Sequence, residues 1–278
     1  MNDQSSNVKA QLLLSYHRDG VLVLPNAWDP ASAAVIARAG ARAIATTSGG
    51  VAWACGLPDG QRISRRTMAE AVERIVRAVD VPVTADMEGG YGPSPDDVAA
   101  TVEAAIDAGA VGMNLEDSEA PGGPLFAIDA QAARLRAARD AARARGVPDF
   151  VLNARTDVFL FQIGDPGGRP DEVRARAAAY ADAGADCLFV PGLLDIEALA
   201  DVVRSSPLPV NAMAGPGGPA VAELAAAGVR RISVGTALAQ TSYAAADRAA
   251  RELLTAGTFG GFDNALGFST MNALFPDR

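Results

Sequence analysis

One short pattern recurs four times along this chain: a helix-forming, alanine-rich segment ends in Ala-Gly and is followed by a run of apolar residues. The pairs are Ala39-Gly40, Ala108-Gly109, Ala183-Gly184 and Ala227-Gly228. Glycine favours the left-handed conformation that closes a helix. A short continuous apolar run is typical of a strand that is buried on both faces of a parallel sheet. The repeat therefore predicts alternating helices and strands joined by short connections.

Eight segments fit this pattern as strands, each followed by a helical stretch. The predicted strands are 21–24, 43–47, 81–85, 111–115, 150–154, 187–190, 208–212 and 232–234, and the helices include 11–19, 65–79, 96–108, 129–145, 171–183, 195–204 and 236–256. No linker rich in Pro, Gly or Ser divides the 278 residues. We therefore expect one (β/α)8 barrel over residues 1–278. A doubly wound open sheet is the alternative, but no Gly-x-Gly-x-x-Gly segment favours it.

Three connections are longer than a barrel requires, and the C-terminus extends beyond the last predicted strand. The long connections are 48–64, 117–128 and 158–170, which would lie on the catalytic face and are candidate lids. Residues from about 236 to 278 are expected to form a long helix and an apolar, glycine-rich tail. Its phenylalanines need cover, either on the same barrel or on a partner subunit.

Composition excludes several classes of protein. The formal net charge of −9 argues against non-specific binding to nucleic acid or anionic membranes. No apolar run approaches the roughly 20 residues of a membrane-spanning helix. Residues 1–9 are polar, read as a tail, and lack the basic-then-apolar order of a signal peptide. A cytoplasmic protein is the resulting expectation.

The chain has one lysine, Lys9, and one histidine, His17. A Schiff-base or pyridoxal-phosphate enzyme needs a buried lysine, and Lys9 falls in the predicted tail. A Ser-His-Asp triad or a histidine-ligated zinc site would depend on His17 alone. We expect His17 to be a partly exposed helix residue without a catalytic role.

Three acidic residues follow two neighbouring strands. Asp86 and Glu88 follow strand 81–85, and Glu116 ends strand 111–115. Like charges at the same end of a parallel sheet repel one another unless a cation or proton lies between them. Oxygen ligands suit a hard cation, so we expect a Mg²⁺ site, with Mn²⁺ as the alternative. Asp86 would bind directly, and both glutamates partly through water, with Glu88 on the face of Asp86 if the strand geometry continues.

Other residues at these strand ends suit an anionic substrate. Arg155 ends strand 150–154 and can hold a carboxylate or phosphonate, although a salt bridge to Asp157 or Glu116 is the alternative. The segment Thr47, Ser48, Gly49 and Gly50 follows the second strand, where a hydroxyl and glycine amides can bind an oxyanion. By local chemistry Asp59 is a turn residue, and Asp117 fits helix capping or surface solvation.

The order of these motifs resembles the isocitrate lyase/phosphoenolpyruvate mutase superfamily over nearly the whole chain. The motifs lie at residues 24–29, 47–50, 56–59, 86–92, 114–117 and 153–157. The resemblance implies a Mg²⁺-dependent barrel that makes or breaks C–C or P–C bonds beside an α-oxocarboxylate. It also implies a homodimer or homotetramer that exchanges the last barrel helix.

The same resemblance assigns roles to individual residues. It places the metal acids at Asp86, Glu88 and Glu116, and the oxyanion-binding backbone at Ser48, Gly49 and Gly50. It places the carboxylate-binding arginine at Arg155, a gating-loop aspartate at Asp59, and a substrate contact at Asn211. Thr47 opens the same oxyanion-binding segment.

Several departures from the family pattern narrow the expected chemistry. Lyases that cleave isocitrate or methylisocitrate carry Lys-Lys-Cys-Gly-His after strand four, whereas residues 119–126 here contain neither cysteine nor lysine. A glutamate after strand six and an arginine near the last helix are also absent, so a tricarboxylate would lack its second anchor. Glu88 stands where aspartate is usual.

The leading hypothesis is therefore a Mg²⁺-dependent lyase or hydrolase that acts on an oxaloacetate- or phosphonopyruvate-like compound through a metal-stabilised enolate. Asp59 would orient or deprotonate a water. The alternatives are a phosphonomutase, a (methyl)isocitrate-type lyase, and an oxoacid-binding barrel without catalysis. A phosphate-binding barrel, using residues 214–218 and 233–236, is a further reading.

Overall fold

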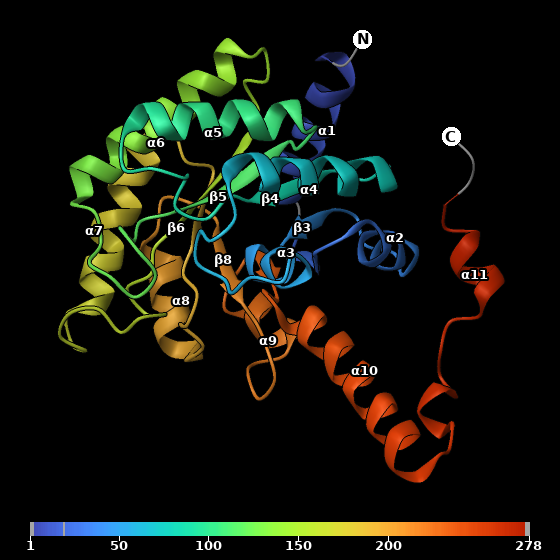
Figure 1. Cartoon of the computed structure of the whole chain (residues 1–278). Coiled ribbons are helices and arrows are strands. Elements are labelled where there is room, and N and C mark those ends of the chain that lie inside the picture. Colours follow the sequence, from blue (N-terminus) through green and yellow to red (C-terminus); the bar gives the residue numbers. More distant parts are fainter. Residues whose placement is uncertain (1–2, 19, 276–278) are drawn as a thin grey trace.

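The computed structural model describes residues 3–18 and 20–275 and shows a parallel barrel surrounded by helices (Figure 1). The strands are β1 (Leu22–Leu24), β2 (Asn26–Ala27), β3 (Ile44–Thr46), β4 (Val83–Asp86), β5 (Gly112–Glu116), β6 (Val151–Arg155), β7 (Cys187–Phe189), β8 (Val210–Met213) and β9 (Arg231–Ser233). They follow the order β1-β9-β8-β7-β6-β5-β4-β3-β2.

Pro25 divides the first barrel strand in two. β1 pairs in parallel with β9, and β2 pairs in parallel with β3, so the two short strands together close the sheet. Proline has no N–H group to donate to a neighbouring strand, which accounts for the break. The predicted (β/α)8 barrel is thus confirmed, and its eight strand positions lie within a few residues of their expected places.

The helices that cover the barrel follow the strands in sequence. They are α2 (Pro30–Arg38), α3 (Ser48–Ala54), α4 (Arg65–Ala78), α5 (Pro95–Asp107), α6 (Ile128–Ala144), α7 (Arg169–Asp182), α8 (Ile196–Ser205), α9 (Val221–Ala226) and α10 (Ala237–Ala256). The four Ala-Gly pairs end α2, α5, α7 and α9, and each of their glycines has a φ between 86° and 100°. These glycines close their helices in the left-handed conformation, as the repeat predicts.

The N-terminal segment differs from its predicted form. α1 spans Asp3–Tyr16, so Lys9 is part of a helix and not of a tail. Asp19, the last residue of the predicted helix, lies outside the described residues. His17 is only 2% exposed, and its Nδ1 lies 2.8 Å from the carbonyl oxygen of Leu13. Burial and the nearby Arg231 lower the pKa of His17 to about 4. The expectation of a partly exposed histidine is wrong, because α1 packs against the barrel.

The long connections approach one another over the C-terminal ends of the strands. A Cβ added at Gly60 would lie 2.8 Å from Pro121, which shows that the first two long connections are in contact. The first connection is shorter than expected, because α3 occupies its first seven residues. In the second, Ser118 and Leu125 form an antiparallel bridge, so it is a compact hairpin. These connections form the rim of the candidate site.

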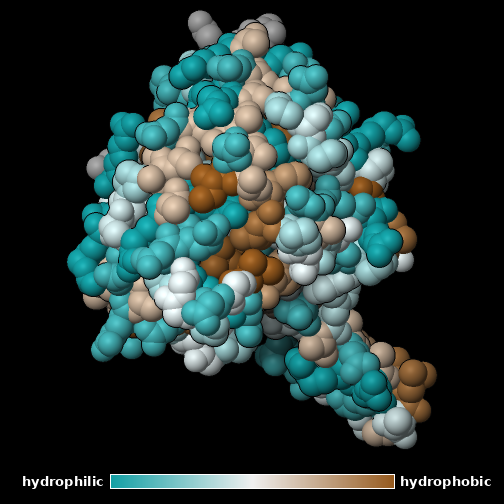
Figure 2. Space-filling view, turned by 90° about the vertical axis from the view of Figure 1, so that its left-hand side faces the viewer, coloured by the Kyte–Doolittle hydropathy of each residue, from teal (hydrophilic) through white to brown (hydrophobic). Residues whose placement is uncertain are grey.

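The C-terminal part forms an arm that extends away from the barrel (Figure 1). α10 ends at Ala256 and is capped by Gly257, where φ is 67°; the turn η1 (Gly260–Phe262) and α11 (Phe268–Asn272) follow. Leu254 and Phe268 are more than 80% exposed. Apolar side chains gather on the outer edge of this arm (Figure 2). No described helix has the length and apolar character that crossing a membrane requires.

We expect the arm to bind a second copy of the chain, because exposed apolar surface is stabilised by burial against a partner. Light scattering after size-exclusion chromatography should give at least twice the monomer mass. Replacing Leu254 and Phe268 by aspartate should give a monomer with an unchanged circular dichroism spectrum. Val8→Asp, at another exposed apolar residue (64% exposed), is the control and should keep the oligomer. A monomeric parent protein would contradict this expectation.

Candidate active site

Asp86 lies at the C-terminal end of β4 and is held there by its neighbours on β3 and α3. Its backbone N–H donates to Thr46 Oγ1 at 2.7 Å, and its Oδ2 accepts the backbone N–H of Ser48 at 2.9 Å. The other oxygen, Oδ1, is buried and has no hydrogen-bond partner among the described residues. A buried carboxylate oxygen without a partner is unfavourable in the protein alone, and it is available to a ligand.

Glu116 and Arg155 stand opposite each other in the register of β5 and β6. Arg155 Nη1 donates to Glu116 Oε1 at 2.5 Å, and Arg155 Nε donates to Asp157 Oδ1 at 2.6 Å. Burial raises the pKa of Glu116 well above its ordinary range, and Arg155 opposes that shift. Burial disfavours the charge of Arg155, but Glu116, Asp157 and Asp86 together raise its pKa. The expected alternative, a salt bridge to these acids, is therefore present.

Arg155 keeps one donor group for another partner. Its Nε and Nη1 bind the two acids, whereas its Nη2 has no acceptor within the described part of the chain. The side chain is 15% exposed, so it reaches the mouth of the barrel. Arg155 therefore pairs with two acids and still has N–H groups that can bind another partner.

Glu88 does not continue the extended geometry of β4. The strand ends at Asp86, and Glu88 has a φ of 50°, which turns its side chain toward the connection after α3. Its Oε2 accepts the backbone N–H of Gln61, and its Oε1 accepts the hydroxyl of Tyr91 at 3.4 Å. Burial and the nearby charge of Asp86 raise the pKa of Glu88 to about 7. The premise that strand geometry places Glu88 beside Asp86 is wrong.

The acids fit a metal bound mainly through one carboxylate. No group of three or more His, Cys, Asp or Glu among residues 3–18 and 20–275 has the arrangement of a metal site. Glu88 and Glu116 are already bonded to the protein, and Asp86 Oδ1 is the oxygen that lacks a partner. Magnesium usually keeps several waters and takes one or two carboxylates. The donor set therefore suits direct binding by Asp86 with water between the ion and the glutamates.

The segment after β3 packs tightly beside Asp86. Thr47 is buried and precedes the first turn of α3, which contains Ser48, Gly49 and Gly50. Amides in the first turn of a helix lack acceptors within the helix. A Cβ on Gly49 would lie 2.8 Å from Thr236, and a Cβ on Gly50 would lie 2.7 Å from Trp28. Larger residues at either position would displace these neighbours, so the glycines allow the close packing.

Asp59 reaches the site from the connection between α3 and α4. Its Oδ2 lies 3.0 Å from the position of a Cβ added at Gly49. Burial and the charge of Asp86 raise its pKa. The structure therefore brings together Asp59, the first turn of α3 and Asp86, although they are distant in sequence.

Asn211 is fully buried inside the barrel on β8. Its Oδ1 accepts the hydroxyl of Ser233 at 3.3 Å, and its Nδ2 has no partner among the described residues. Residues 214–218 and 233–236, which the phosphate-binding hypothesis uses, are hydrogen-bonded to each other. The N–H of Ala214 donates to the carbonyl of Ser233 at 2.8 Å. The expected substrate contact by Asn211 stays a prediction.

Two buried arginines that the sequence analysis did not single out position the site. Arg134 from α6 donates to the carbonyls of Gly89, of Gly92 at 3.3 Å and of Glu116 at 3.3 Å. It thereby ties the turn after β4 to the end of β5. Arg176 from α7 donates to Asp117 at 3.1 Å.

Asp117 is a buried structural residue and not a surface or capping residue. It accepts hydrogen bonds from the hydroxyl of Tyr180 at 2.7 Å and from the backbone N–H of Asp157 at 3.0 Å. Ser118 in turn donates to Asp157 at 2.6 Å. This network fixes Asp157, which holds Arg155. Its members lie far apart in sequence, so no local pattern identifies it.

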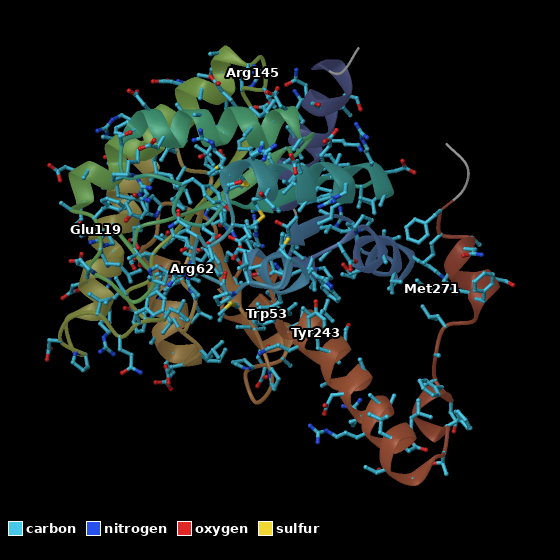
Figure 3. The ribbon with its side chains drawn as sticks, in the orientation of Figure 1. Trp53, Arg62, Glu119, Arg145, Tyr243 and Met271 are labelled. Carbon is cyan, nitrogen blue, oxygen red and sulfur yellow. The ribbon has the colours of Figure 1, made fainter. Side chains whose placement is uncertain are left out.

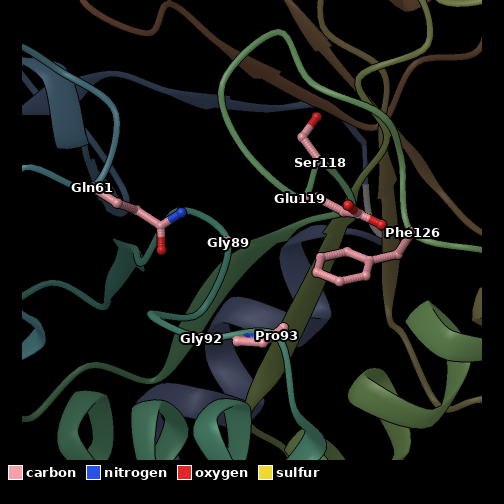
Figure 4. A pocket seen from close by; sticks show the side chains of 7 residues that line it. All are labelled: Gln61, Gly89, Gly92, Pro93, Ser118, Glu119 and Phe126. Carbon is pink, nitrogen blue, oxygen red and sulfur yellow. The ribbon is translucent and has the colours of Figure 1, made fainter.

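A cavity of about 520 Å³ opens between the connections that follow α3, β4 and β5 (Figure 4). It is lined by Gln61, Gly89, Gly92, Pro93, Ser118, Glu119 and Phe126. Figure 4 shows Gln61 and Glu119 on opposite walls, with Phe126 beside Glu119. Trp53 lies away from this cavity and contacts Tyr243 of α10, with ring centroids 6.4 Å apart (Figure 3).

Known proteins share this arrangement of strands and helices. A family model described as phosphoenolpyruvate phosphomutase matches residues 13–254. An uncharacterised protein of Mycobacterium tuberculosis is 38% identical over 237 residues, which is 84% of this chain and 86% of that protein. A Burkholderia cenocepacia structure, provisionally assigned as a lyase or mutase, has a TM-score of 0.90 at 40% identity and covers 99% of this chain and 98% of its own.

The structure of oxaloacetate acetylhydrolase with its product oxalate has a TM-score of 0.85 at 28% identity. The match covers 96% of this chain and 93% of that enzyme. Other relatives include 2-methylisocitrate lyase of Escherichia coli and phosphoenolpyruvate phosphomutase of Streptomyces platensis. The chain belongs to the phosphoenolpyruvate phosphomutase family of the isocitrate lyase/phosphoenolpyruvate mutase superfamily, whose enzymes are lyases and mutases that act on C–C or C–P bonds.

Proposed function

We propose that this enzyme is a Mg²⁺-dependent lyase or hydrolase, with Mn²⁺ as an alternative metal, that cleaves a C–C or P–C bond of a small α-oxocarboxylate. The observation that carries the proposal is the unpartnered Oδ1 of Asp86. The other oxygen of this carboxylate accepts the Ser48 N–H from the first turn of α3, and the charge of Asp86 contributes to the raised pKa of Arg155. A substrate such as oxaloacetate or phosphonopyruvate has two anionic ends and an oxo group, which match these features.

Acidic residues would bind the metal, whereas backbone amides and an arginine would bind the negatively charged groups of the substrate. Asp86, with Glu88 and Glu116 through water, would hold the metal, which supplies a Lewis acid for the oxo-carboxylate. The amides of Gly49 and Gly50 can donate to an oxygen that gains negative charge as the bond breaks. The free edge of Arg155 can bind the second carboxylate or the phosphonate.

Asp59 is the residue best placed to handle a proton. Its carboxylate lies against the first turn of α3, and its pKa is raised by burial and by Asp86. A carboxylate with a raised pKa is a stronger base, so it can accept a proton from an attacking water near neutral pH. Hydrolysis therefore fits the site better than the cleavage of a tricarboxylate, for which the sequence offers no second anchor.

The substrate class is tested by product formation from a panel of compounds. Oxaloacetate, phosphonopyruvate, dimethylmalate, methylisocitrate and isocitrate are each incubated with the protein and Mg²⁺, and products are followed by NMR. We expect turnover of oxaloacetate or phosphonopyruvate, and its loss in EDTA with recovery on adding Mg²⁺ or Mn²⁺. Binding of an oxoacid without turnover of any compound would contradict the catalytic role and favour a binding protein.

Asp86→Asn should abolish the binding of Mg²⁺ measured by isothermal titration calorimetry without substrate. The amide keeps the shape and the acceptor for Ser48 but loses the charge that a hard cation requires. Asp96→Asn, at an exposed residue in the first turn of α5, is the matched control and should bind as the parent protein does. Equal Mg²⁺ affinity in both variants would exclude Asp86 as the ligand.

Arg155→Lys should lower kcat/KM by about 100-fold, because an ammonium keeps the charge but loses the fork of N–H donors that holds two acids and a substrate. Steady-state kinetics on the compound that is turned over checks this expectation. Arg66→Lys, at an arginine whose side chain is 85% exposed, is the control. A loss of less than threefold in Arg155→Lys would remove this residue from substrate binding.

A further inference from the structure

The connection between α3 and α4 contacts the turn after β4 through two hydrogen bonds. We name residues 55–64 the gate loop and residues 87–94 the metal turn. The backbone N–H of Gln61 donates to Glu88 Oε2, and the backbone N–H of Tyr91 donates to Gln61 Oε1 at 3.1 Å. Within the metal turn, the hydroxyl of Tyr91 also donates to Glu88 Oε1 at 3.4 Å. Gln61 therefore bonds to the metal turn through both its backbone and its side chain.

The residues that form this contact have unfavourable backbone conformations. Among the described residues, four that are not glycine have a positive φ, and three of them are Gln61 at 56°, Glu88 at 50° and Tyr91 at 58°. Such conformations are uncommon for residues with a Cβ and persist where surrounding contacts hold them. The fourth, Gln162 at 55°, lies in the connection after β6. The two segments thus adopt strained turns at the place where they meet.

The gate loop also carries Asp59, two residues before Gln61. The carboxylate of Asp59 lies against Gly49, with its Oδ2 3.0 Å from the position of a Cβ added there. Arg134 fixes the other side of the contact, because it binds the carbonyls of Gly89 and Gly92 in the metal turn. A loop bonded to a turn that is itself held by a buried arginine has few ways to move. The position of Asp59 is then set by the bonds of Gln61.

We propose that Gln61 is a positioning residue that holds the gate loop closed over the site, with Glu88 as the acceptor that it binds, so that Asp59 stays beside the first turn of α3. Glu88 has the length to span from the metal turn to the gate loop. The consequence for turnover rests on the proposed function, whereas the closed loop does not. Opening of the loop would leave the metal site intact and remove Asp59 from the substrate.

The first test uses Gln61→Gly, which keeps the backbone N–H and the left-handed conformation but removes the acceptor for Tyr91. Arg62 is exposed beside Gln61 (Figure 3), so tryptic cleavage after Arg62 reports on the loop without any substrate. Mass spectrometry should show at least tenfold faster cleavage there. Gln162→Gly, with the same residue type and nearly the same φ, is the control and should leave this rate unchanged.

The second test changes the acceptor in two ways. Glu88→Gln keeps the length and an oxygen that can accept the Gln61 N–H, so cleavage after Arg62 should stay within threefold of the parent rate. Glu88→Asp keeps the charge but is one methylene shorter, so cleavage should accelerate at least tenfold. The opposite order would overturn the assignment of Glu88 as the acceptor. Circular dichroism confirms that each variant is folded.

Comparing kcat with the Mg²⁺ dissociation constant distinguishes a positioning role of Gln61 from a general loss of structure at the site. Gln61→Gly should lower kcat about tenfold on the compound that is turned over, while its Mg²⁺ dissociation constant stays within twofold. Unchanged cleavage after Arg62 in Gln61→Gly would overturn the proposal whatever the activity. Faster cleavage in a protein whose parent turns over no oxoacid would support the loop contact and contradict the proposed function instead.

Discussion

Repulsion among clustered carboxylates is the constraint around which the mouth of this barrel is organised. Asp86 and Glu116 end neighbouring parallel strands, and Asp59 and Glu88 join them from two connections. Each of the last three has a raised pKa, with burial as the largest cause and Asp86 as a contributor. Arg155 compensates part of this charge by binding Glu116. A divalent cation beside Asp86 would compensate the remaining negative charge, so metal binding would also stabilise the folded site.

Helices and connections outside the barrel hold the charged residues of the site in place. Arg134 and Arg176 enter from α6 and α7 and bind backbone carbonyls or Asp117 beneath the site. They keep the ends of β5 and β6 in place without contributing to the open mouth. The connections above the strands form the rim of the candidate site, and they contact each other at Gly60 and Pro121. A rigid barrel thus supports a site whose upper wall is formed by loops, where relatives of one fold differ in chemistry.

The strands and the helix ends could be predicted because they depend on local pattern. Apolar runs and the Ala-Gly pairs place every barrel strand, and the motifs bring Asp86, Glu116 and Arg155 to one end. The burial of His17 could not be predicted, because it depends on how α1 packs on the barrel. The extended geometry expected at Glu88 is wrong, because β4 ends two residues earlier, at Asp86. Gln61 carries no local signal at all, and its partners are 27 and 30 residues away.

We propose that the unpartnered oxygen of Asp86 is a metal ligand. Crystals grown with Mn²⁺ and measured at the manganese absorption edge would locate the ion directly by anomalous scattering. We expect one peak within about 2.2 Å of Asp86 Oδ1, a distance typical of small divalent cations with oxygen ligands, with waters between the ion and Glu88 and Glu116. A peak bound elsewhere, or none at saturating Mn²⁺, would contradict the account.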